Sequence, residues 1–457
     1  MDRFPILRSL DPWHARIGYL GAFASVATRG LDTAEALGVR FQDLLLPRIY
    51  PDDPYYAKLM ARVPEHRRAE LEKRKMRPEQ EDPSAAFTEL APTDGNAVPA
   101  DWLLGASSKR PKPRLVKTDW LYASEFWLYD EVMPSALGHL SREKLDKRTL
   151  NLARTTGVLL PTLELSDLGY LLKFFLEEAK KKEGGDATMF NPLNPHAHEC
   201  LPPLYFLIML SNEILYPFLL AEFVERVARG DKLSTRGKND GLLICAVNRL
   251  VEAIGKITDP EDAPALWEVE KFRDTIAESD STQENYLRPR LEILVDLGFL
   301  GRKQSRGGKR TDFMWEVTQS TRALDKELRE FTSRGACAQL GDYLDTRYFA
   351  SMARALGRTM SPVTGPSEHL LWFAKAFKDI GREFGFTPGR TLALRACLMA
   401  WQNGRTMEVK NAFDAVYYAA DKKIAKYLHF SGGSRFDREF LIRIDEEIID
   451  ELRAATA

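Results

Sequence analysis

Two short stretches of the chain carry residue types that metal chemistry uses. The first is HAHEC, residues 196–200, which places two histidines, a glutamate and a cysteine within five positions. Imidazole, carboxylate and thiolate groups are all zinc ligands. Prolines flank the stretch, however, and no second ligand pair at a suitable spacing occurs elsewhere. We therefore predict no metal site there.

The second stretch is MEVK, residues 407–410, which matches the Glu-x-Lys half of a metal-dependent nuclease core. That core needs the pair on a strand, with an upstream acid to share the cation. Here the pair opens an amphipathic helix for which Thr406 is the expected N-cap, so we interpret Glu408 as a surface residue. No Walker-type phosphate loop, GxSxG or HExxH motif occurs. We therefore assign no catalytic residue, metal or cofactor and expect no enzymatic activity. A nuclease whose acids are dispersed in the sequence remains an alternative.

The strongest chemical signal is a basic, glycine-rich loop. Residues 301–310 contain five basic side chains and three glycines but no acid. Lysine and arginine contact phosphates, glycine lets a backbone approach closely, and a preceding helix can enter the major groove. The candidate DNA-binding residues are Asn285, Arg288 and Arg290 before the loop, and Arg302, Lys303, Arg306, Lys309 and Arg310 within it. A merely solvated hairpin tip is the alternative.

A helix and two strands must position this loop. Apolar residues at helical spacing run from 287 to 295 and end at a glycine, after which Phe299 and Leu300 begin a strand. Residues 313–317 return as an apolar strand, and another helix follows. This order predicts a winged-helix unit over residues 240–332 whose wing carries the basic loop.

A similar order occurs earlier in the chain. Residues 145–155 predict a helix and 157–160 a strand, and a tight turn then leads to a helix that begins at Ser166. Serine is a good N-cap because its hydroxyl accepts a free backbone N–H. We therefore expect another winged-helix unit over 120–180. Its very short wing favours a structural or dimer-forming role.

Composition divides the rest of the chain. Residues 83–118 are rich in Pro, Ala, Ser and Gly, which is typical of a linker. The apolar stretch 201–223 is interrupted by prolines and acids, which indicates buried helices rather than a membrane span. We predict a mainly α fold of tandem winged-helix units joined by helical connectors. Its expected parts are a helical region with a basic Pro-rich linker (1–118), a first winged helix with connector (119–239), a second with a basic wing (240–332), and a helical domain with a possible third winged helix (333–457).

Charge and cysteine usage restrict the class of protein. The chain has 65 Lys and Arg against 66 Asp and Glu, a net charge of −1. This balance weakens the case for a constitutive nucleic-acid coat but permits local basic faces. Four cysteines without a CxxC pair favour neither a zinc ribbon nor a disulfide framework. The N-terminus has no signal segment, so we expect a cytoplasmic protein without a membrane partner.

The repeated element order, carried by Leu150 to Leu172 and Leu287 to Leu324, resembles prokaryotic winged-helix DNA-binding proteins. It is similar to the recognition domains of type IIS restriction endonucleases and to accessory proteins of phage-defence systems. The resemblance implies a DNA-binding subunit of a multi-component bacterial system, in antiviral defence or plasmid maintenance. Its expected partners are duplex DNA and one or more proteins. No cleavage domain is recognisable, so no catalytic residue carries over. The alternative is a kleisin-like scaffold that docks proteins through winged helices.

Overall fold

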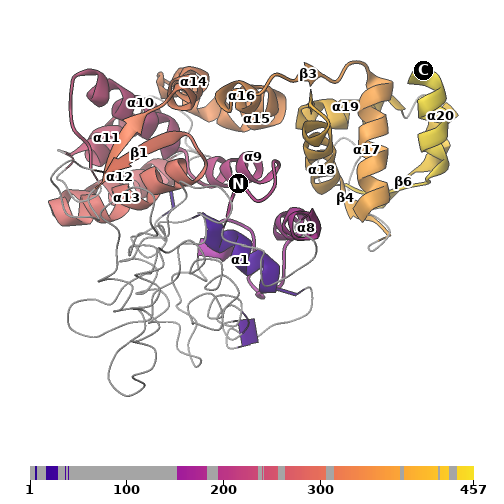
Figure 1. Cartoon of the computed structure of the whole chain (residues 1–457), viewed down its shortest axis with the longest axis horizontal. Helices are drawn as coiled ribbons and strands as arrows, with labels where there is room; N and C mark the ends of the chain where they lie inside the picture. The colour runs from indigo at the N-terminus through magenta and orange to yellow at the C-terminus, as the bar shows by residue number, and fades with distance from the viewer. Residues whose placement is uncertain are drawn as a thin grey trace, which may run out of the picture. The chain divides into compact units, whose positions relative to one another are not determined.

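The computed structural model is mainly helical, with three small sheets among the residues that it describes (Figure 1). This confirms the mainly α class. The described residues are 6–7, 17–28, 36–37, 40, 152–182, 194–234, 239, 241–255, 263–304, 313–380, 385–419, 423–431 and 440–456.

The chain forms two compact units. The first comprises Met1–Glu252 and Thr258–Thr318, and the second comprises Ala253–Ile257 and Gln319–Ala457. The expected boundary between residues 332 and 333 therefore lies instead after Thr318. The physical reason is that the helix over 319–328 packs on one over 348–355.

The elements of the first unit are α1 (Gly18–Val26), α8 (Asp167–Lys182), α9 (Leu201–Asn212), α10 (Leu215–Ala228), α11 (Leu242–Ile254), α12 (Ala263–Ala277), α13 (Asp280–Asp296), β1 (Leu300–Gln304) and β2 (Phe313–Val317). Helix α1 packs against α8. Described residues from the expected parts 1–118 and 119–239 thus share one compact unit.

Helices α9 and α10 form much of the core of the first unit. Every residue from 201 to 210 and from 215 to 223 is buried, which confirms the expectation of buried helices. Among the described helices, none is by itself long and apolar enough to cross a membrane. Helices α9 and α10 meet that criterion only as a pair, and the pair is bent by 106°.

A tight turn precedes α8. Leu159 and Leu165 form an antiparallel bridge, and the Ser166 hydroxyl accepts the backbone N–H of Gly169 at 3.0 Å. The predicted N-cap is therefore confirmed. Of the helix expected over 145–155, residues 152–155 are described and are helical, whereas 120–151 lie outside the described residues.

The antiparallel pair β1–β2 follows α13. Gly298 ends the helix with a left-handed φ of 78°, a conformation that glycine adopts without steric cost. Leu300 then lies opposite Val317, and Gln304 opposite Phe313. The expected pair of strands is therefore confirmed, although its tip, residues 305–312, lies outside the described residues.

A third extended segment, residues 233–234, lies beside β2. Ser234 bridges Met314, and the backbone N–H of Trp315 donates to the Leu233 carbonyl at 3.0 Å. In this unit α10 is followed by the extended segment, then by α11, α12 and α13, and then by β1 and β2. The extended segment lies beside β2, the last strand.

The elements of the second unit are α14 (Gln319–Leu328), α15 (Leu340–Thr346), α16 (Tyr348–Ala355), β3 (Ser361–Pro362), α17 (Pro366–Ile380), β4 (Thr387–Pro388), α18 (Gly389–Gln402), β5 (Arg405–Thr406), α19 (Val409–Ala419), β6 (Leu428–Ser431), β7 (Leu441–Ile444) and α20 (Glu447–Thr456), with short 3₁₀ turns at 329–332, 336–339 and 423–427. Helices α17, α18 and α19 pack together, and α20 packs on α17.

The C-terminal part of the second unit has a related order of elements. Helix α17 is followed by β4, then α18 and α19, and then β6 and β7. The strands form an antiparallel sheet in the order β4-β7-β6, so the first strand again lies beside the last. Residues 432–439 between β6 and β7 lie outside the described part of the chain.

Candidate nucleic-acid interface

A buried carboxylate joins helix α13 to the β1–β2 hairpin. Glu292 Oε1 accepts a hydrogen bond from Trp315 Nε1 at 2.7 Å, and its Oε2 accepts one from Arg302 Nη1 at 3.0 Å. The Arg302 and Glu292 side chains are only 3% and 2% exposed. A buried charge is tolerated when it is paired and hydrogen-bonded. Glu292 therefore fixes α13, β1 and β2 relative to one another.

Arg290 occupies a second buried ion pair in the first unit. Its Nε and Nη2 donate to Glu213 Oε1 at 3.0 and 2.6 Å, and its Nη2 also donates to the Leu7 carbonyl at 2.9 Å. Glu213 lies at the bend between α9 and α10. The second half of α13 is thus surrounded by protein, and its arginine supports the core.

These contacts correct two expectations. Arg290 and Arg302 were expected to face DNA, but the structure buries both side chains against carboxylates. The sequence near each arginine does not show that Glu213 or Glu292 will lie beside it. The basic residue type alone therefore does not distinguish a buried ion pair from a DNA contact. Neither residue belongs to the exposed surface.

The other described candidates lie on the surface. Asn285 is exposed on α13, and the Arg288 side chain, 33% exposed, lies 3.7 Å from Glu284. Lys303 is 64% exposed and lies 3.9 Å from Glu316. The remaining candidates, Arg306, Lys309 and Arg310, lie outside the described residues.

Asn239 holds the exposed half of α13 beside the third extended segment. Its side-chain Nδ2 donates to Glu284 Oε2 at 2.6 Å and to the Ser234 carbonyl at 3.1 Å. Its Oδ1 accepts the Ser234 N–H at 2.9 Å. Sequence reasoning missed this residue. The only local signal is that asparagine often bonds to nearby backbone in turns.

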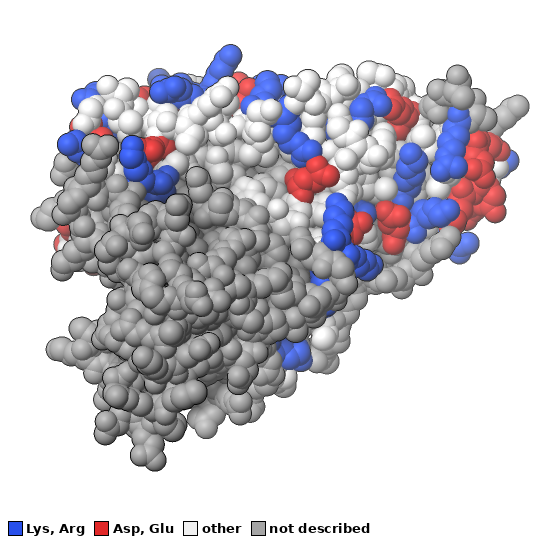
Figure 2. All heavy atoms as spheres, viewed as in Figure 1, with Lys and Arg blue, Asp and Glu red and all other residues white. Residues whose placement is uncertain are grey.

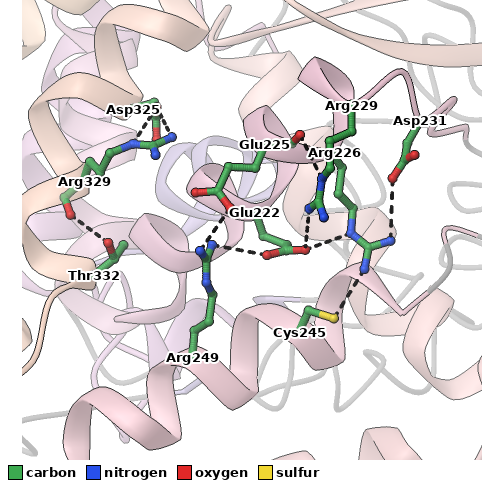
Figure 3. A network of polar contacts seen from close by, with 10 residues as sticks. All are labelled: Glu222, Glu225, Arg226, Arg229, Asp231, Cys245, Arg249, Asp325, Arg329 and Thr332. Atoms are coloured by element: carbon green, nitrogen blue, oxygen red, sulfur yellow. Dashed lines mark hydrogen bonds and ion pairs between the residues drawn. The ribbon is translucent and has the colours of Figure 1, made fainter.

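A network of charged side chains joins α10 to α11 (Figure 3). The largely buried Glu222 accepts hydrogen bonds from Arg226 at 2.9 Å and from Arg249 at 3.2 Å. Arg226 also donates to Cys245 Sγ at 3.3 Å. The i, i+4 spacing of Glu222 and Arg226 is the local sequence signal for this pair. This network holds α10 against α11. Residues 231–234 follow α10 in the chain, and Ser234 lies beside β2 of the hairpin.

The HAHEC stretch has structural contacts. His196 Nε2 donates to the Asp296 carbonyl at 2.7 Å, and burial lowers the pKa of this imidazole. His198 Nδ1 accepts the Cys200 N–H at 3.2 Å, and its Nε2 lies 3.5 Å from Glu178. Within the described ranges no three metal-ligating side chains converge. The two histidines therefore position this loop against α13 and α8.

Glu408 is buried, which corrects its interpretation as a surface residue. Its Oε2 accepts the Phe349 N–H at 2.9 Å, and its Oε1 accepts the Ala350 N–H at 2.8 Å. It therefore caps the N-terminus of α16, where free N–H groups need acceptors. Thr406 lies on β5 opposite Pro362, and Glu408 directly precedes α19. Burial raises the pKa of the Glu408 carboxyl to about 7.

Comparison with known proteins does not extend this description. No protein-family model matches the chain, and no curated protein or solved structure is significantly similar to it.

Proposed function

We propose that this chain binds duplex DNA through the exposed half of α13 and the β1–β2 hairpin, as the DNA-binding subunit of a multi-component bacterial system. The element order supports the proposal. Each unit contains a helix, a strand or extended segment, further helices and two strands, with the first strand beside the last. This order is typical of winged helices, which place one helix in the major groove and a wing on the backbone.

The basic stretch in the hairpin carries the proposal. The strand partners bring Gln304 opposite Phe313, so residues 305–312 connect the strands. Arg302 is buried, but the connection and its flanks still supply four basic side chains: Lys303, Arg306, Lys309 and Arg310. Phosphate contacts of this kind supply most of the sequence-independent affinity for DNA. Asn285 and Arg288 are the proposed base-contacting residues, since both reach the surface of α13.

A second function, protein docking, is favoured by one observation in the second unit. Helix α19 occupies the place in the element order that α13 occupies in the first unit. Its only basic residue is Lys410, and its Tyr417 is 47% exposed. Such a helix suits contact with a protein better than contact with phosphates. The proposed subunit therefore uses its first unit for DNA and its second unit for a partner protein.

Duplex binding by the purified chain at two or more salt concentrations tests this proposal. Contact with phosphates releases counterions, so affinity should fall steeply as salt rises. Negligible affinity at every salt concentration would leave protein docking as the only function supported.

A further inference from the structure

Arg288 of α13 lies beside an acid on its own helix. Its Nε is 3.7 Å from Glu284 Oε2, one turn earlier. The Glu284 side chain is 13% exposed, whereas that of Glu316, the acid beside Lys303, is 47% exposed. Solvent and salt screen exposed ion pairs strongly and partly buried pairs less. Glu284 therefore compensates its cation more fully than Glu316 does.

The Arg288 guanidinium has one covered side and one open side. Its Nε is buried and has no hydrogen-bond partner among the described residues. No hydrogen bond to a described residue occupies its terminal nitrogens, and neither of them is buried. The side chain as a whole is 33% exposed. The two terminal nitrogens, which can donate together to a planar pair of acceptors, therefore face solvent.

Asn239 fixes the Glu284 carboxylate with two donors. Its backbone N–H donates to Glu284 Oε1 at 2.8 Å, and its Nδ2 donates to Oε2 at 2.6 Å. Asn239 is 1% exposed and is itself held by two hydrogen bonds with Ser234, which bridges Met314 of β2. A connected series of contacts thus runs from the hairpin through Asn239 and Glu284 to Arg288. Support of this kind keeps a binding side chain close to one orientation.

A cation that already has an acid beside it suits a base edge better than a phosphate. Figure 2 shows acidic side chains beside many of the basic ones on the described surface, so a basic residue there does not by itself mark a phosphate contact. Glu284 weakens the attraction of Arg288 to phosphates but leaves the directional hydrogen bonds of its terminal nitrogens available. Guanine presents its O6 and N7 acceptors together in the major groove, and arginine can bond to both.

We propose that Arg288 reads a guanine in the major groove and that Glu284 and Asn239 are its positioning residues. This inference rests on the proposed DNA interface and names the base that the interface selects. Without Glu284, the same guanidinium is a less restrained cation that binds phosphates of any sequence, and such contacts carry no sequence information. Glu284 therefore lowers sequence-independent affinity and raises the preference for guanine.

Selection by the full chain from a pool of duplexes with randomised central base pairs tests this inference. The parental chain should enrich guanine at one position or more, and Arg288→Met should abolish the enrichment at one of them. At that position 7-deazaguanine, which lacks N7, should weaken binding by the parental chain about fivefold or more. A parental chain that binds no duplex would overturn the proposed function together with this inference. Guanine enrichment that is absent from the parental chain, or that survives unchanged in Arg288→Met, would overturn this inference alone.

Two further variants test the positioning roles, on one duplex with guanine at that position and one with adenine. Glu284→Gln leaves Arg288 uncompensated, so the preference for guanine should fall and the log–log salt slope should steepen by up to about 0.9. Asn239→Ser should weaken binding of the guanine duplex more than that of the adenine duplex, whereas a purely structural effect weakens both equally. Glu252→Gln removes an exposed acid from α11 and should change neither preference nor slope.

Circular dichroism checks that each of these variants is folded. Parental preference and slope in Glu284→Gln, or equal weakening of both duplexes by Asn239→Ser, would overturn the positioning role of the residue concerned.

Discussion

The indole Nε1 of Trp315 donates a 2.7 Å hydrogen bond to Glu292 Oε1, and both side chains are about 2% exposed. Through this contact the last strand of the hairpin is attached to the second half of α13. The same carboxylate holds Arg302 of the first strand. One buried acid thus fixes both strands of the hairpin relative to the helix.

Glu292→Ala should therefore destabilise the first unit strongly. Removing one partner of a buried pair leaves the other charge unpaired and typically costs about 3–5 kcal/mol. The urea dependence of folding measures the loss. As a control, Glu316→Ala removes an exposed acid beside Lys303 and should change the free energy of unfolding by less than about 1 kcal/mol. Equal effects of the two substitutions would show that the Glu292 contacts do not hold the hairpin.

Arg290 and Arg288 should separate stability from DNA binding. Arg290→Ala leaves Glu213 buried without its cation, so a loss of about 3–5 kcal/mol in the free energy of unfolding is expected. Arg288→Ala should cost less than about 1 kcal/mol but alter preference among DNA sequences, where a bidentate contact to guanine contributes roughly 1–3 kcal/mol. Denaturation and competition binding measure the two quantities. Strong destabilisation by Arg288→Ala with tolerance of Arg290→Ala would reverse this assignment.

The free energy of unfolding of the second unit should fall as pH rises from about 4.5 to about 7, because Glu408 titrates in this range. Burial raises the pKa of this carboxyl from 4.5 to about 7. The folded chain therefore binds the proton more tightly than the unfolded chain. The resulting stabilisation is complete below the unfolded pKa and is lost as pH passes the folded pKa. Urea midpoints at several pH values measure this trend.

Glu408→Gln should remove that pH dependence, because an amide does not titrate in this window. A second acid, Glu327, provides an internal comparison. Its hydrogen bond with Arg354 lowers its pKa, so its contribution is present above the unfolded pKa and is lost only as pH falls further. A slope between pH 4.5 and 7 that persists in Glu408→Gln would show that another group titrates there.

Ser166→Ala should cost about 1 kcal/mol, the usual effect of losing an N-cap. Its hydroxyl accepts the Gly169 N–H, whereas the Thr162 hydroxyl donates to the carboxylate of Glu164 on the exposed surface of the turn. Thr162→Ala is therefore the matched control, with an expected change below about 0.5 kcal/mol. Thermal unfolding of both variants measures the difference. Equal shifts would contradict the capping role.

Features with a local cause were predictable from the sequence. Ser166 caps α8 because its hydroxyl reaches an N–H three residues later. Gly298 ends α13, and the apolar residues at 299–300 and 313–317 predict the two strands. The buried helices at 201–223 follow from apolar content alone.

Features that depend on distant partners were not predictable. Arg290 and Glu213 are 77 residues apart, and Glu408 and Phe349 are 59 apart. Such long separations leave no local pattern in the sequence. For this reason the sequence alone suggests a DNA contact for Arg290 and a surface position for Glu408. The same reasoning missed Asn239, whose role depends on Glu284, 45 residues away.

The salt dependence of duplex binding by one multiple variant tests the central claim most directly. In this variant Lys303, Arg306, Lys309 and Arg310 are all changed to Ser. The matched control changes four exposed basic residues of the second unit: Arg322, Lys326, Arg334 and Lys410. If the hairpin binds phosphates, the hairpin variant should lose up to about 0.9 per contact from the log–log salt slope, and the control should keep the parental slope. An unchanged slope in the hairpin variant, with DNA binding intact, would contradict the proposed interface.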